Sequence, residues 1–145
     1  MVRVVGGRGK FVDIHMTGMS MVMHRLRSAQ KEVESSVDLG VIKAGGHVQE
    51  EVKESIAGRR AEPKSVDTGL LGNSIVVNKI KKAEVKVEPR GDTYPGTSTT
   101  TKEVATHLEY GTSKINPRRH FRNTEARTKG EVKGIIQKEI KIGKI

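Results

Sequence analysis

The chain has 145 residues, with 27 Lys and Arg against 17 Asp and Glu, so its formal net charge is +10. It contains no cysteine and no tryptophan, which excludes disulfides, thiolate metal sites and thiol nucleophiles. No apolar run is long enough to span a membrane, and the first ten residues lack the apolar stretch of a secretory signal. We therefore expect an intracellular, soluble, strongly basic protein with one domain and a thin aliphatic core.

Residues 1–17 are predicted to form a flexible N-terminal arm. Gly6, Gly7 and Gly9 follow the short apolar run Val2–Val5, and residues 11–16 alternate only loosely. We assign residues 18–145 to a single α+β domain.

From residue 18 the apolar residues recur at helical spacing. Gly40, Gly45 and Gly46 weaken the centre of this pattern, so it predicts two consecutive helices or one long bent helix. Gly58 is placed to end the helical region, and Pro63 prevents its continuation. The first apolar stripe is Met19, Val22, Met23, Leu26, Ala29 and Val33, and the second is Val41, Ala44, Val48, Val52 and Ile56.

The middle of the chain predicts a small antiparallel sheet with a hairpin. Residues 74–81 place Ile75, Val77 and Ile80 on the apolar face of one strand, and residues 83–88 place Val85 and Val87 on one face of the next. A polar loop without aliphatic residues follows over 90–102. Loops of this length are usually functional or disordered.

The last third of the chain predicts two further elements. Val104, Ala105 and Leu108 begin a strand or a short helix, and residues 121–141 form a C-terminal helix. From residue 118 onward nine basic residues stand against three acidic ones. This basic tail either binds phosphates or an acidic partner, or it is a solvated helix face. The apolar face of the helix is Val132, Ile135, Ile136 and Ile140.

The sequence contains no complete motif for phosphate binding, metal binding or nucleophilic catalysis. The Gly-rich segment 6–10 lacks the spacing and the Ser or Thr of a phosphate-binding loop. His107 and Glu109 have the spacing of a zinc deaminase motif, but the cysteines that complete that site are absent. No Gly-x-Ser-x-Gly elbow occurs. We therefore predict no catalytic residue, no cofactor and no metal site.

Two polar-to-apolar junctions have a distinctive order of residues. In segment 66–75, Asp67 and Thr68 can bond local amides, and Gly69 allows a turn before the strand. In segment 104–122, an apolar element ends at Gly111, and a stretch beginning at Pro117 leads into the last helix.

Together these segments resemble the head–tail joining, or tail-completion, proteins of long-tailed bacterial and archaeal viruses. The similarity covers residues 18–141, with the same order of helices and sheet. Two departures stand out: His120 replaces the Pro usual before the Phe, and the 90–102 loop is long, which makes it a candidate for partner specificity. The matching positions are Asp67, Thr68, Gly69, Leu71, Ser74 and Ile75, then Ala105, Glu109, Tyr110, Gly111 and Thr112, and finally Pro117 and Phe121.

The resemblance implies a non-enzymatic structural protein of the virion neck, made in the host cytoplasm. Its partners would be like subunits in a ring, six-fold if it follows the tail tube, the head-side connector, and the tail tube or tail terminator around the genomic DNA. The motif positions are either turn and sheet signatures or partner contacts. The alternatives are a small DNA-binding protein using its C-terminal helix, and a related minor capsid or tail component. The candidate interface residues are Arg118, Arg119, Phe121 and Arg122, an Arg-rich segment with an aromatic anchor.

Overall fold

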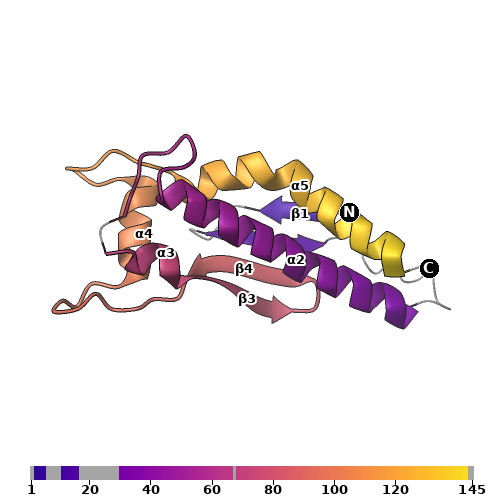
Figure 1. The fold of residues 1–145 in the computed structure, drawn as a ribbon. Helices are drawn as coiled ribbons and strands as arrows, with labels where there is room; N and C mark the ends of the chain where they lie inside the picture. The colour runs from indigo at the N-terminus through magenta and orange to yellow at the C-terminus, as the bar shows by residue number, and fades with distance from the viewer. Residues whose placement is uncertain (1, 6–10, 17–29, 67, 144–145) are drawn as a thin grey trace.

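The computed structural model describes residues 2–5, 11–16, 30–66 and 68–143. The fold is α+β, as predicted: two long helices lie side by side on one face of a four-stranded antiparallel sheet (Figure 1). The strands are ordered β1-β2-β4-β3 across the sheet. The elements are β1 (Val2–Val5), β2 (Val12–Met16), α2 (Gln30–Ile56), α3 (Leu70–Ser74), β3 (Ile75–Lys81), β4 (Glu84–Pro89), α4 (Thr101–Tyr110) and α5 (His120–Gly143).

The N-terminal segment is part of the sheet, so the prediction of an irregular arm over residues 1–17 is wrong for strands β1 and β2. The two strands pair with each other, and β2 also pairs with β4, which places Val12 opposite Val87 and Ile14 opposite Val85. Val12 and Ile14 are buried as a result. The partner strand is far along the chain, and local alternation alone does not reveal such a pairing.

The predicted hairpin is confirmed, with one correction to its apolar face. Strands β3 and β4 pair antiparallel, and Val85 and Val87 are buried. Between Lys79 and Lys81 the register shifts by one residue, so Ile80 has no partner in the ladder. Ile80 is 55% exposed and does not share the face of Ile75.

Helix α2 is one continuous helix through all three glycines, and its second apolar stripe is confirmed as buried. Two of these glycines are close-packing positions. A Cβ on Gly45 would lie 2.8 Å from a methyl of Val77 and 2.9 Å from a methyl of Val85, and one on Gly40 would lie 3.1 Å from the backbone of Ile136. Of the first stripe, Val33 is buried and residues 19–29 lie outside the described part of the chain.

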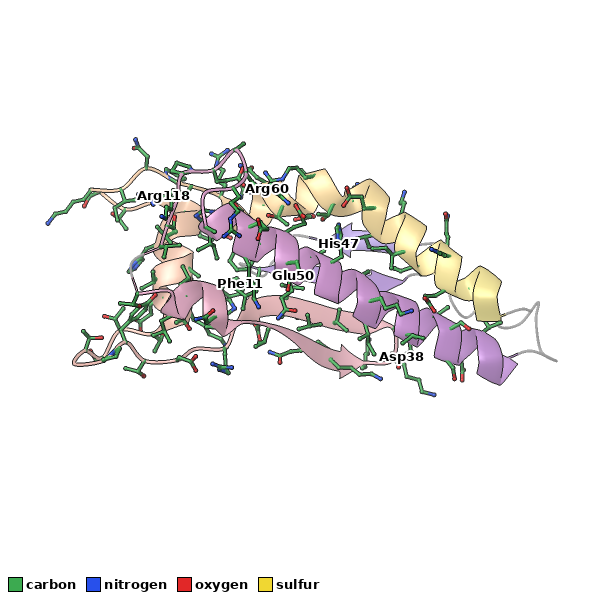
Figure 2. All side chains as sticks on the ribbon, in the orientation of Figure 1. Phe11, Asp38, His47, Glu50, Arg60 and Arg118 are labelled. Atoms are coloured by element: carbon green, nitrogen blue, oxygen red, sulfur yellow. The ribbon has the colours of Figure 1, made fainter. Side chains whose placement is uncertain are left out.

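Polar contacts join α2 to its neighbours along its length (Figure 2). Asp38 accepts from Lys79 Nζ at 2.6 Å and from the Ala83 amide at 3.1 Å at the hairpin turn. His47 contacts Glu131 of α5. These contacts fix the helix against both the sheet and the other long helix.

The remaining elements gather at the end of the molecule where α2 ends (Figure 1). Of the two alternatives for the segment after the long loop, the helix is correct. It begins at Thr101, so residues 101 and 102 of the predicted loop are helical. Thr100 caps this helix by accepting from the Glu103 amide. Helix α5 begins at His120 and buries Val132 and Ile136, as predicted, against α2 and the sheet.

Candidate functional site

The segments that carry the family resemblance meet at one end of the molecule, around α3, α4 and the start of α5. The Arg118 amide donates to the Leu108 carbonyl at 2.6 Å, which holds the entry to α5 against α4. Helix α3 contacts α4 from the other side. Residues separated by about fifty positions in the chain therefore form one site.

The first segment forms the turn into β3. Gly69 has a φ of +83°, a left-handed conformation that favours glycine, and Thr68 Oγ1 accepts from the Leu70 amide at 3.3 Å. Ser74 Oγ donates to the Leu71 carbonyl at 2.7 Å. Leu71, Ser74 and Ile75 are buried. These residues stabilise the turn and the core around it. Asp67 lies outside the described residues.

Glu109 of the second segment caps the C-terminal helix. Its carboxylate is 5% exposed and accepts from the amides of Phe121 and Arg122 at 3.0 and 2.9 Å. Burial raises the pKa of Glu109, and the two amides with nearby Arg119 and Arg122 act in the opposite direction. The carboxylate thus satisfies two amides that the first turn of a helix leaves without partners.

The turn after α4 requires its glycine. Gly111 has a φ of +79°, and a Cβ there would lie 2.8 Å from both the Ile115 carbonyl oxygen and Pro117 Cδ. The Thr112 amide donates to the Ile115 carbonyl at 2.8 Å and closes the turn. The neighbouring motif residues differ in burial: Ala105 is buried, whereas Tyr110 and Pro117 are exposed.

The four candidate interface residues have different environments. Phe121 is 3% exposed and packs edge-on against Phe11 with ring centroids 5.1 Å apart, so its prediction as a contact residue is wrong. It is a core residue, packed against the ring of Phe11 just before β2. Arg119 and Arg122 are exposed, and Arg118 is half-buried.

A polar network lies beneath this end of the molecule, between α2, α5 and the 57–66 loop. Ser55 Oγ donates to Glu62 Oε1 at 2.5 Å and lies 2.7 Å from His120 Nδ1. His120 Nε2 lies 2.7 Å from Ser65 Oγ. Arg127 donates two hydrogen bonds to Glu62, both at 2.8 Å. Every buried side-chain nitrogen and oxygen in the described ranges has a hydrogen-bond partner.

The network defines the tautomer of His120. The Ser55 hydroxyl has one proton and donates it to Glu62, so it accepts from His120 Nδ1–H. In the neutral ring, His120 Nε2 is then an acceptor for the Ser65 hydroxyl at 2.7 Å, and the same hydroxyl lies 3.2 Å from the Pro63 carbonyl oxygen as a second acceptor. Ser65 Oγ in turn accepts from Arg118 Nη1 at 2.9 Å. A chain of hydrogen bonds runs from the exposed loop to the buried carboxylate.

The Ser65–His120 pair has the spacing of a nucleophile and its base, but its electrostatics favour a structural role. Burial lowers the pKa of His120 to about 4; Glu62 opposes this, and Arg118 and Arg127 add to it. Burial opposes ionisation of Glu62, yet hydrogen bonds from Arg127, Ser55 and Asn123 lower its pKa to about 2. Glu62 favours an imidazolium, but burial and the two guanidinium groups of Arg118 and Arg127 together outweigh it. The neutral ring acts as a bridge between two hydroxyls.

The sequence patterns did not predict this network, although one of its members carries a local signal. Ser55 adjoins Ile56 at the end of the buried stripe of α2, and a polar residue at such a position is a usable signal for a buried polar contact. Glu62 carries no such signal, because it lies in a short loop and is buried only through contacts with α5. His120 was notable only as a departure from the family pattern.

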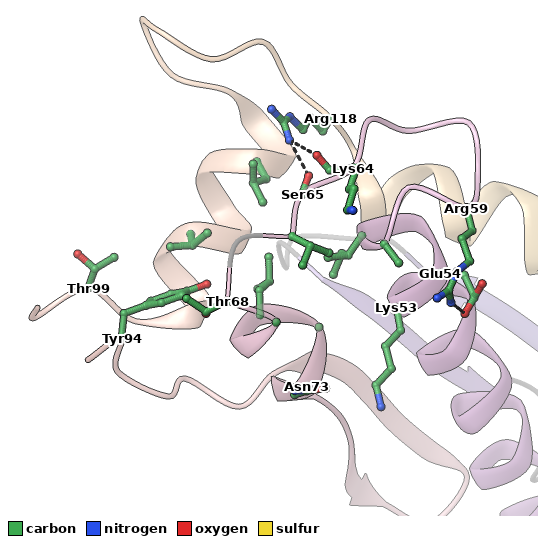
Figure 3. Close-up of a pocket in the computed structure, with 18 of the residues that line it drawn as sticks. Lys53, Glu54, Arg59, Lys64, Ser65, Thr68, Asn73, Tyr94, Thr99 and Arg118 are labelled. Atoms are coloured by element: carbon green, nitrogen blue, oxygen red, sulfur yellow. Dashed lines mark hydrogen bonds and ion pairs between the residues drawn. The ribbon is translucent and has the colours of Figure 1, made fainter. Parts of the chain in front are cut away.

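A pocket of about 890 Å³ opens beside the network (Figure 3). It lies between the end of α2, helices α3 and α4, and the two loops at residues 64–69 and 94–99. Both segments that carry the family resemblance, 66–75 and 104–122, contribute to its walls. The lining residues from these segments include Thr68, Gly69, Leu71, Leu108 and Arg118.

Within the described ranges, no group of three or more His, Asp or Glu residues is arranged to hold a metal ion. None of the helices in that part of the chain is long and apolar enough to cross a membrane. In comparisons with known proteins, no family model, curated protein or solved structure matches the chain.

Proposed function

We propose that this chain is a structural subunit of the neck of a long-tailed virus, a head–tail joining or tail-completion protein that works as a ring. One observation carries the proposal. Three short segments that resemble this family converge on one end of the fold, where Gly69, Glu109 and Gly111 each have a specific conformational or capping role. The first segment ends at residue 75 and the next begins at residue 104, and the contact between α3 and α4 brings them together.

The architecture supports assembly into a ring. In the described sheet, β1 and β3 each have a single neighbouring strand, so both edges are open for pairing with another chain. Two different edges on one subunit suit head-to-tail contacts, which close into a ring when the rotation allows. Arg119 and Arg122 are exposed beside the converging segments and are the candidate contacts from the predicted interface.

Light scattering on the purified full chain, over a range of concentration and salt, tests the proposal. We expect a discrete multiple of the 15.9 kDa subunit, six for a ring that matches the tail tube, and we expect it to persist in high salt. A monomeric mass at every protein concentration would contradict a ring that forms without its neighbours.

A DNA-binding protein is the second candidate, and the C-terminal helix favours it. Lys129, Lys133 and Lys138 are all exposed on α5. This function predicts duplex binding that weakens steeply with salt, and a further loss when Lys129 and Lys133 are both replaced by Glu. Tight, salt-dependent binding by a monomer would favour this candidate over the neck ring.

A further inference from the structure

The pocket beside Arg118 has the size and lining of a binding site. Its volume of about 890 Å³ lies in the range typical of ligand pockets. Most of the exposed wall area is apolar, and the walls combine segments from both halves of the chain. The aliphatic lining residues are Ile56, Ala57, Val66, Leu71, Val104 and Leu108, and Tyr94 and Pro95 add to the apolar lining.

The polar groups of the pocket leave a positive charge uncompensated. Arg118 donates from Nη1 to the Lys64 carbonyl at 2.7 Å and to Ser65 Oγ at 2.9 Å, and both acceptors are neutral (Figure 3). No carboxylate among the described residues pairs with this half-buried guanidinium. Among the described residues, its remaining donors have no carboxylate partner, so an anion that enters the pocket can bind them.

The other charged residues that line the pocket also leave it with a net positive charge. Arg59 and Glu54 pair at 2.7 Å and cancel each other. Lys53, Lys64 and Arg118 then stand against Glu50 among the described residues of the lining. The pocket thus combines an apolar interior with a net positive wall.

The surroundings of the pocket indicate a protein partner. Val66 lines the pocket and is 44% exposed. Outside the lining, Tyr110 at the end of α4 and Ile115 in the turn that follows are 49% and 39% exposed. Exposed apolar side chains of this kind are typical of protein contact surfaces.

We propose that this pocket docks an acidic peptide segment of a partner protein, with an aliphatic side chain in the pocket and an adjacent carboxylate on Arg118. A guanidinium with free donors is well suited to a carboxylate, which it can bind through two hydrogen bonds. The inference extends the proposed function, because it states the chemistry of the neighbour that this end of the subunit would receive.

Methyl NMR on the isotope-labelled full chain tests the proposal with three capped tripeptides: acetyl-Leu-Glu-Leu-amide and its counterparts with Gln and with Lys at the centre. We expect the Glu peptide to shift the methyl resonances of Ile56, Val66 and Leu108 and to bind at least tenfold more tightly than the Gln peptide. The methyls of Val37 and Val41, deep in the core, should not respond.

Matched substitutions separate the charge from the shape of the pocket. Arg118→Gln should weaken the Glu peptide at least tenfold. Val66→Glu, at an exposed position outside the polar network, should abolish binding by repulsion, whereas Val66→Lys should retain it. Lys114→Gln removes one charge from the adjacent loop, outside the pocket lining, and should change nothing.

Three results would overturn the proposal: equal affinity for the three peptides, unchanged binding in Val66→Glu, or no methyl shift at about 10 mM peptide. The mass of the same sample by light scattering separates this inference from the ring. If the protein forms a ring but does not bind the peptides, the docking proposal is wrong and the proposed ring stands. If the protein is a monomer that binds the Glu peptide, the docking proposal is supported and the ring is contradicted.

Discussion

Glu109 connects the two halves of the candidate site through a single carboxylate. It is buried, it is the acceptor for two amides at the start of α5, and its ionisation is opposed by burial. A buried amide without an acceptor is costly, and here two would lose their acceptor at once.

Replacing Glu109 with Ala should therefore lower the free energy of unfolding by about 2–4 kcal/mol, because both amides lose their partner. Glu109→Gln keeps one acceptor oxygen and should lower it by less. Urea denaturation measures the difference. Glu103→Ala, at an exposed position of the same helix, is the control and should change stability by about 0.5 kcal/mol at most. Equal effects of the two alanine variants would refute the capping role.

His120 makes stability depend on pH. Its pKa in the folded protein is about 4, below the ordinary 6.5, so the unfolded chain binds a proton that the folded chain does not. The stability that this histidine contributes is complete above pH 6.5 and is lost as the pH falls from 6.5 towards 4. Glu62, with a pKa of about 2, adds a second loss that begins only below its ordinary value of 4.5.

Between pH 6 and pH 5, proton linkage through His120 alone should lower the free energy of unfolding by about 1.2 kcal/mol. His120→Gln should remove this slope, whatever it does to stability at neutral pH. Denaturation midpoints across the window measure it. His107→Gln replaces an exposed histidine of α4 and should keep the slope. A slope that survives in His120→Gln would assign the pH dependence to another group.

At the scale of elements, the close contact between α2 and the sheet depends on Gly45. An added Cβ would approach the methyls of Val77 and Val85 to less than 3 Å, whereas Gly46 has nothing within 4 Å of that position. The two glycines are adjacent in one helix, so they form a matched pair.

Gly46→Ala should raise the free energy of unfolding by about 0.5–1 kcal/mol, because alanine is the better helix former. Gly45→Ala gains the same preference but forces the sheet away from the helix, and we expect a net loss of about 1–2 kcal/mol. Thermal and urea denaturation of both variants test this. Similar stabilisation by both would show that the helix does not approach the sheet as closely as described.

The elements differ in how well local sequence predicts them. The second stripe of α2, the β3–β4 hairpin and the apolar face of α5 follow from periodicity and turn residues, and all three are confirmed. Strands β1 and β2 were missed because β2 joins the sheet through β4, far along the chain, and β1 joins it through β2. Ile80 was misplaced because a bulge changes the alternation that assigns residues to faces.

At the scale of the whole molecule, one end combines structural motifs, a polar network and a pocket, while the long helices and the sheet extend away from it (Figure 1). Arg118 belongs to all three features, since it holds the 64–65 loop, contacts the network through Ser65 and lines the pocket. The three features therefore meet at the entry to α5.

The α+β class, the helical faces, the hairpin and the glycine turns at Gly69 and Gly111 follow from local sequence. They depend on local propensity, periodicity and backbone conformation, which neighbouring residues decide. The fold was needed to show that Phe121 is buried against Phe11, that Glu62 and His120 share one network, and that Arg118 lines a pocket without a carboxylate partner among the described residues. Each of these depends on contacts between segments far apart in the chain, and local sequence does not encode which distant segment supplies the partner.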